Sequence, residues 1–140
     1  MKRAALLSLV SLASLQCQAE ARHCQAEVRL TDQAAIRAIV GEAANQSDRV
    51  MLAVAGALRN RGTLAGVYGL NAPVTRSSTS AVWARAARAW AQSAQPISQT
   101  EVRLAAGCRY FGCQTDARYF LRTLHFHPVV TIGQITFYKP

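Results

Sequence analysis

The stretch between Ser47 and Gly62 constrains the fold most, because it predicts a helix that is apolar on most of its sides. Its apolar positions are Val50, Met51, Val54, Ala55, Ala57 and Leu58. The rest of the chain has to cover such a helix, so we expect it at the centre of the core. Ser47 is a typical cap at a helix start, and Gly62 is typical of the position after a helix end. Small residues within the stretch, Gly56 among them, would let a neighbouring helix approach closely.

The remaining hydrophobic pattern predicts further helices and one β-hairpin. One helix should run from Thr31 to a break at residues 45–47, and others should cover residues 81–93, 98–106 and 115–122. After Pro128, β-branched and aromatic residues flank Gly133-Gln134, a pattern typical of a hairpin with a type II′ turn. A length of 140 residues fits one domain. The predicted fold class is mainly α (α+β), a helical domain with a small C-terminal β-hairpin.

The N-terminus has the pattern of a secretory signal peptide. A positive start, Met1-Lys2-Arg3, precedes an apolar run from Ala4 to Leu15 that is too short to span a bilayer. Ala19-Glu20-Ala21 is a cleavage site of the A-x-A type, and Cys17-Gln18-Ala19 is a weaker alternative. We therefore predict a signal peptide at residues 1–21, a mature domain at residues 22–140, and export to the periplasm, the cell envelope or the outside of the cell.

The charge of the chain favours an anionic partner. Sixteen Lys and Arg residues against seven Asp and Glu residues give a formal net charge of +9 at pH 7. For an exported protein, the acidic polymers of a bacterial envelope fit this charge best. The basic residues form no dense run, so we expect no nucleic-acid binding. We also expect no stable membrane insertion once the signal is removed, and a membrane-active cationic protein is the least favoured class.

Three cysteines would remain after cleavage, and they leave several disulfide pairings open. Cys108 and Cys113 could close the short loop between them, or Cys24 could bridge to either one. The odd number leaves a free thiol or an intermolecular bridge. The thiols and the histidines of the His125-Phe126-His127 segment do not have zinc-site spacing, so we predict no metal and no other cofactor.

Glu42 lies where an apolar helical run ends. It is one turn beyond Ala38 and Ile39, so it should sit at the edge of the buried face. Loss of water there favours the neutral carboxylic acid and raises its pKa, as a general acid requires. By periodicity alone, a solvated Glu in the last turn of an amphipathic helix is the favoured interpretation.

Four motifs together resemble the SleB-like cell-wall hydrolase family, which includes spore-cortex-lytic enzymes. Glu42-Ala43 is similar to the start of the family's E-A-x-x-E motif, and Asn60-Arg61 follows at the family's spacing. The segment Gly107-Cys108-Arg109-Tyr110-Phe111 is similar to the family's G-A-x-Y-F. Thr131-Ile132-Gly133 and Phe137-Tyr138 are similar to its closing motif. Gln46 stands at the family's second acidic position, and Gln134 and Ile135 replace the Asn and His of the closing motif.

This resemblance implies a lysozyme-like, monomeric enzyme that acts on peptidoglycan glycan strands. Glu42 would be the acid/base of a lytic transglycosylase, which cuts the MurNAc–GlcNAc bond and leaves a 1,6-anhydro product. Tyr110 and Tyr138 would contact substrate, although buried aromatic residues would have the same pattern. Asn60 would support Glu42, and Gln134 would be a further substrate contact.

Hydrolysis with two carboxylates would need a second acid near Glu42, so the positions of the other acids bear on the choice between the two mechanisms. Asp32 and Asp48 fit first-turn positions of helices, and Asp116 fits a helix cap. Only Glu27 and Glu101 lack a structural role, and neither lies in a matched motif. A mechanism with Glu42 alone is favoured, while hydrolysis stays open. The alternative from another class is a non-catalytic envelope-binding protein on the same fold.

Overall fold

The computed structural model describes residues 30–140. The predicted signal peptide, Cys24 and Glu27 lie outside these residues. The described elements, in chain order, are α2 (Asp32–Ala43), α3 (Asp48–Arg61), η1 (Tyr68–Asn71), α4 (Val74–Ser77), α5 (Ser80–Gln92), α6 (Thr100–Ala106), β1 (Tyr110–Cys113), η2 (Gln114–Asp116), α7 (Ala117–Arg122), β2 (His127–Ile132) and β3 (Ile135–Lys139). The fold is mainly α with a small antiparallel sheet, as predicted. Within residues 30–140, no helix is both long and apolar enough to cross a bilayer.

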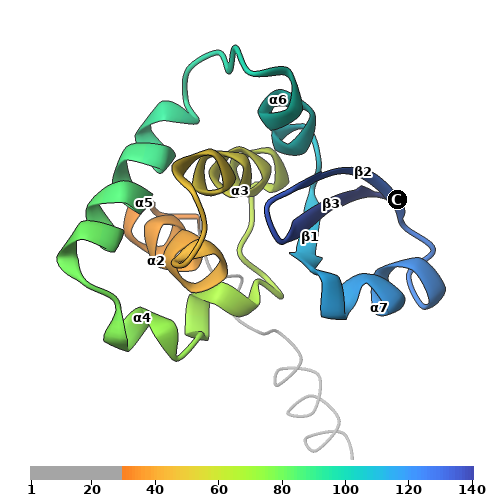
Figure 1. Ribbon diagram of the computed structural model, residues 1–140, viewed down its shortest axis with the longest axis horizontal. Coiled ribbons are helices and arrows are strands. Elements are labelled where there is room, and N and C mark those ends of the chain that lie inside the picture. The colour runs from red at the N-terminus through yellow and green to blue at the C-terminus, as the bar shows by residue number, and fades with distance from the viewer. Residues whose placement is uncertain (1–29) are drawn as a thin grey trace, which may run out of the picture.

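Helix α3 is the centre of the molecule, as its sequence predicts. Every residue from Val50 to Leu58 except Leu52 is buried. In Figure 1, α2, α4 and α5 lie on one side of α3, and the sheet with α7 lies on the other. The hydroxyl of Ser47 accepts a hydrogen bond from the N–H of Val50, and Gly62 ends the helix with a φ of 75°. Both boundary predictions are confirmed.

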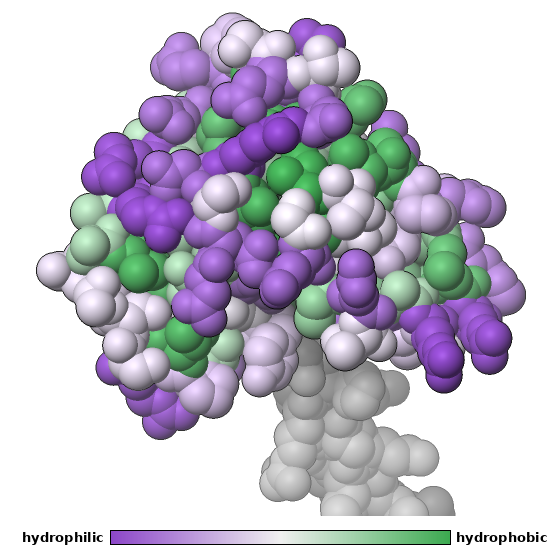
Figure 2. Space-filling view, viewed as in Figure 1, coloured by the Kyte–Doolittle hydropathy of each residue, from purple (hydrophilic) through white to green (hydrophobic). Residues whose placement is uncertain are grey.

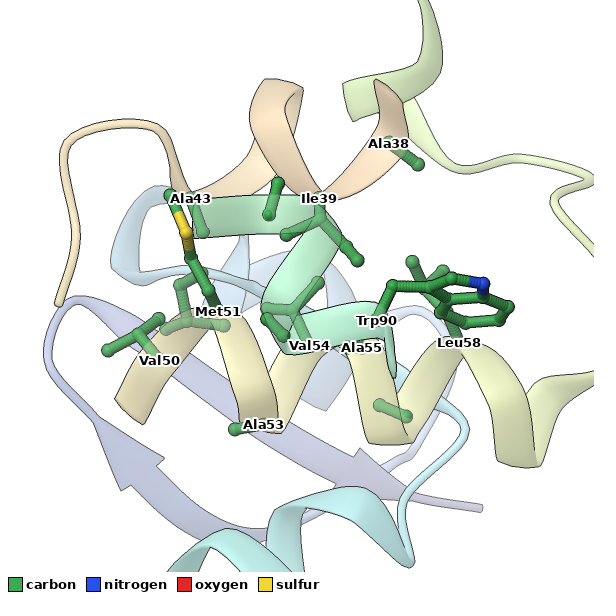
Figure 3. Close-up of a cluster of buried hydrophobic side chains, with 14 of the residues drawn as sticks. Ala38, Ile39, Ala43, Val50, Met51, Ala53, Val54, Ala55, Leu58 and Trp90 are labelled. Atoms are coloured by element: carbon green, nitrogen blue, oxygen red, sulfur yellow. The ribbon is translucent and has the colours of Figure 1, made fainter. Parts of the chain in front are cut away.

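Close packing around α3 depends on its small residues. A Cβ added at Gly56 would lie 2.4 Å from the Cβ of Ala106, so α6 is the helix that approaches closely. On the opposite side, Figure 3 shows Ile39 of α2 facing Val54 of α3. The indole of Trp90 on α5 is also buried in this core. The central helix is therefore covered from several directions, which leaves little of its surface for binding.

The sheet contains the predicted hairpin and one additional strand. Strands β2 and β3 pair antiparallel, with Ile132 opposite Ile135 across the two-residue turn, and Gly133 has the positive φ of 61° that this turn requires. The predicted hairpin is confirmed, and the sequence did not predict the additional strand β1, which pairs with the other edge of β3. Tyr110 stands opposite Tyr138 in that pairing. Strand β3 is therefore the central strand, and its side chains are mostly buried.

Large hydrophobic side chains reach the surface at only a few described positions. Figure 2 shows hydrophilic side chains over much of one face, with hydrophobic ones exposed between them. The most exposed large hydrophobic residues are Tyr68 (73% exposed), Tyr119 (56%), Leu104 (46%) and Leu121 (45%). The two tyrosines belong to the candidate site described next.

Candidate active site

A cleft of about 520 Å³ opens beside the last turn of α2. Its walls come from α2, α3, the turn before η1, strand β1 and the α7 region, so it lies between the helical side of the molecule and the sheet side. Glu42 and Arg61 line it from the helices, Tyr68 from η1, and Tyr110 and Asp116 from the sheet side. The structure therefore brings together two of the sequence-predicted site residues, Glu42 and Tyr110.

Glu42 is positioned by the helix that carries it and by a backbone contact. Thr31 caps α2 by accepting a hydrogen bond from the N–H of Ala34 at 3.2 Å, which sets the helix register. Ala38 and Ile39 are fully buried, and Glu42 is half-buried at the edge of that face, as predicted. The backbone N–H of Gly69 donates a 2.6 Å hydrogen bond to Oε1 of Glu42. Oε2 is then the oxygen available to exchange a proton.

The surroundings of Glu42 raise the pKa of its carboxyl above the ordinary value of 4.5. Burial is the largest cause, because a charged carboxylate loses water there. The N–H of Gly69 stabilises the charged form and lowers the pKa. The negative charge of Asp116 raises it again, and the positive charge of Arg61 lowers it. The net effect keeps Glu42 protonated to a higher pH than an exposed Glu, as a general acid requires.

Arg61 supplies the positive charge of the cleft. Its guanidinium carbon lies 5.4 Å from the centre of the Tyr110 ring, and it donates a hydrogen bond to the carbonyl of Ala65. Burial lowers the pKa of Arg61 from its ordinary value. Arg61 belongs to the Asn60-Arg61 segment that resembles the SleB-like pattern, so the sequence alone could have indicated Arg61 as a site residue.

Asp116 is a second carboxylate in the cleft, and it stands at the predicted N-cap position of α7. It precedes α7, but its side chain makes no capping hydrogen bond. Its Oδ2 instead accepts a hydrogen bond from the thiol of Cys113 at 3.2 Å. A Thr-Asp pair before a helical segment is typical of a cap, so the sequence pattern predicted the position of Asp116 but not the contact of its side chain.

Three of the predicted substrate-site residues lie outside the cleft lining. Asn60 donates hydrogen bonds of 3.2 Å to the carbonyls of Gly107 and Cys108, so it fastens the connection from α6 to β1. Tyr138 is 1% exposed, because it lies on the central strand and the ring of Phe120 covers it at 4.7 Å. The prediction that Tyr138 lines an open groove is therefore wrong.

Gln134 lies at the hairpin turn and contacts Gln46 instead of the cleft. The side-chain amide of Gln46 donates to Oε1 of Gln134 at 3.1 Å, and the backbone N–H of Gln134 donates back to Oε1 of Gln46 at 3.3 Å. Both residues stand where the chain departs from the SleB-like pattern. Their reciprocal bonds tie the hairpin to the end of α2.

Cys108 and Cys113 form no disulfide with each other, so one of the disulfide pairings left open by the sequence is absent. Cys108 is buried, and its thiol donates to the carbonyl of Leu104, whereas Cys113 is exposed at the cleft and contacts Asp116. The separation arises because β1 runs extended between the buried end of α6 and the cleft. Burial raises the pKa of the Cys108 thiol. The pairings with Cys24 fall outside the described residues.

Two exposed aromatic side chains of the cleft have no counterpart in the sequence prediction. Tyr68 projects from η1 and Tyr119 from α7, and both line the cleft with Glu42. Neither lies in a periodic or matched motif, so no local signal pointed to them. Within residues 30–140, no group of three or more His, Cys, Asp or Glu side chains is placed to hold a metal ion.

The fold and the cleft together define a small, mainly α domain with one half-buried carboxyl group in an aromatic-lined cleft. Comparison with known protein families, with curated proteins and with solved structures finds no significant match.

Proposed function

We propose that the protein cleaves the glycan strands of peptidoglycan, with Glu42 as the acid/base. The observation that carries this proposal is the half-buried carboxyl of Glu42, whose pKa is raised by burial and which opens into a cleft with exposed tyrosines. The four motifs that resemble SleB-like hydrolases support the same assignment. The predicted export and the basic charge of +9 suit a protein that works on an anionic wall.

The reaction that these residues support is that of a lytic transglycosylase. Glu42, protonated at Oε2, gives its proton to the glycosidic oxygen as the bond from the muramoyl anomeric carbon to that oxygen breaks. The resulting carboxylate then takes the proton of the muramoyl C6 hydroxyl as that oxygen attacks the anomeric carbon. A 1,6-anhydro end forms, and Glu42 is protonated again. The Gly69 N–H stabilises the carboxylate between the two transfers.

The glycan would lie against the aromatic side chains of the cleft. Tyr68 and Tyr119 expose their rings on elements from the two sides of the cleft, and exposed rings provide flat apolar faces against which pyranose rings can pack. Tyr110 contributes a third, half-buried ring to the same cleft. Arg61 would attract the carboxylates that muramoyl groups and their peptides carry.

Digestion of purified sacculi by the mature protein tests this function. We expect mass spectrometry to detect anhydro-muropeptides with the wild type and none with Glu42→Gln. Glu101→Gln is the matched control, because it removes an exposed carboxylate on α6 and should leave the products unchanged. Equal release of fragments by Glu42→Gln would exclude Glu42 as the acid. Binding to sacculi without any cleavage would instead support the envelope-binding alternative.

A further inference from the structure

The acidic side chains of residues 30–140 divide into two groups. Three have partners outside the cleft: Asp32 with Trp90, Asp48 with Arg85, and Glu101 with Arg49. The other two, Glu42 and Asp116, line the same cleft, and neither forms an ion pair with a described residue. Partners outside the cleft thus account for every described acid except the two that line the proposed site, Glu42 and Asp116.

The local structure holds the Asp116 carboxylate at the cleft. The thiol of Cys113 donates to Oδ2, and no capping bond to α7 competes for that oxygen. Gly112 makes room for it: a Cβ there would lie 3.2 Å from Oδ2 of Asp116 and 2.7 Å from the Phe120 ring. Strand β1 therefore carries a glycine at the position where a side chain would displace the carboxylate.

We propose that Asp116 is a positioning residue for Glu42: its carboxylate is a standing negative charge that keeps the acid proton on Glu42 while a glycan strand fills the cleft. The inference rests on the proposed function of the cleft. Asp116 is exposed, so water weakens its effect on Glu42 in the free protein without removing it: the charge of Asp116 already raises the pKa of Glu42 there. A bound glycan displaces that water, and repulsion between two carboxylates becomes stronger in the lower dielectric.

The charge of Asp116 opposes the effect of the other polar groups around Glu42. Arg61 from α3 and the N–H of Gly69 both favour the charged form of Glu42. The remaining titratable side chains that line the cleft carry no charge when protonated; they are Tyr68, Tyr110, Cys113 and Tyr119. Within the described residues, Asp116 is thus the one charged group at the cleft that opposes the effect of Arg61.

Carbon-13 NMR of protein labelled at its Glu carboxyl groups tests the proposal without substrate. The Glu42 resonance is assigned by its loss in Glu42→Gln. We expect its titration midpoint to fall in Asp116→Asn and to stay unchanged in Glu101→Gln, which removes the same charge elsewhere. An unchanged midpoint in Asp116→Asn would overturn the proposal, whether or not the protein cleaves peptidoglycan. If Asp116→Asn does not fold, Asp116→Ser removes the same charge and is assessed in the same way.

The pH profile of sacculus digestion separates a positioning role from direct chemistry. We expect Asp116→Asn to keep the anhydro products and to lose activity at a lower pH than the wild type as the pH rises. Hydrolytic products from the wild type, together with a folded Asp116→Asn that is inactive at every pH, would mean that Asp116 activates water, and this would overturn the positioning role. If the wild type cleaves no peptidoglycan, the proposed function is wrong. The effect of Asp116 on the Glu42 carboxyl is still decided by the NMR titration.

Discussion

The backbone N–H of Gly69 and Oε1 of Glu42 are joined by a hydrogen bond of 2.6 Å between residues 27 positions apart in the chain. Two glycines make this approach possible. A Cβ at Gly69 would lie 2.5 Å from Cγ of Glu42, and a Cβ at Gly41 would lie 1.8 Å from the carbonyl oxygen of Gly69. The turn η1 therefore packs directly on the last turn of α2. This contact buries one side of the Glu42 carboxyl and fixes one of its oxygens.

Replacement of Gly69 by Ala should damage both the fold and the site. The added methyl has to push α2 and η1 apart, which we expect to cost about 1–3 kcal/mol of unfolding free energy. Loss of the hydrogen bond should also lower glycan cleavage per folded molecule. Gly107→Ala is the control, because a Cβ there meets only ordinary contacts of 3.4 Å or more. Denaturant unfolding and sacculus digestion measure the two effects, and a Gly69→Ala protein as stable as the control would contradict the close packing.

The raised pKa of Glu42 predicts a pH-dependent stability difference. A carboxyl whose pKa is higher in the folded than in the unfolded state stabilises the fold below its unfolded value, near 4.5. This contribution is lost as the pH rises through the folded pKa. Glu42→Gln carries no such group, so it should unfold at a higher temperature than the wild type at pH 7. The difference should shrink as the pH falls through the folded pKa of Glu42 and should stop changing below about 4.5; a difference independent of pH would contradict the raised pKa.

The helical part of the fold was predictable because its boundaries are local. Thr31, Ser47 and Gly62 act as caps through contacts with residues a few positions away, and the apolar run of α3 is buried wherever it packs. The edge position of Glu42 followed from the same periodicity. The motif pattern added Tyr110 and Arg61, which lie in the cleft with it.

The sheet side was less predictable because its contacts join distant parts of the chain. Nothing local in Tyr110–Cys113 specifies a strand; it becomes one by pairing with β3. That pairing makes β3 the central strand and buries Tyr138. Asp116 has the sequence pattern of a cap, and only the fold brings it into the same cleft as Glu42.

Asn60 should matter for stability and not for substrate binding. Its side-chain amide satisfies the carbonyls of Gly107 and Cys108, and Asn60→Ala leaves both without that donor. We expect a loss of about 1–3 kcal/mol in unfolding free energy, with no change in KM for soluble glycan fragments. Asn45→Ala, at an exposed turn, should change stability by less than about 0.5 kcal/mol. A raised KM in a folded Asn60→Ala would restore Asn60 as a substrate contact.

Tyr68 should contribute to glycan binding through its ring. Its side chain is 73% exposed, so its loss should not change the unfolding temperature. In a Glu42→Gln background, Tyr68→Ala should bind glycan fragments several-fold more weakly, whereas Tyr68→Phe keeps the ring and should bind like the parent. Leu104→Ala removes another exposed apolar side chain, outside the cleft lining, as the control. Calorimetric titration measures the affinity, and equal binding by Tyr68→Ala would exclude the ring from the site.

Phe120 should hold α7 against the sheet. Helix α7 has no buried residue of its own, and Phe120 stacks on Tyr138 with ring centres 4.7 Å apart and planes inclined by 18°. The centre of the Phe120 ring also lies 6.2 Å from the centre of the Phe126 ring.

Phe120→Ala should therefore release α7 locally, and with it the cleft wall that carries Tyr119. Because the Phe120 ring is only half-buried, the loss of unfolding free energy should be smaller than the roughly 3–5 kcal/mol typical of a Phe→Ala change in a core. Hydrogen exchange should accelerate at residues 117–122 while α3 stays protected, and glycan cleavage should fall. Leu121→Ala, on the same helix but exposed, should leave exchange unchanged. Uniform acceleration across α3 in Phe120→Ala would mean that this ring supports the whole domain, and the local role would be wrong.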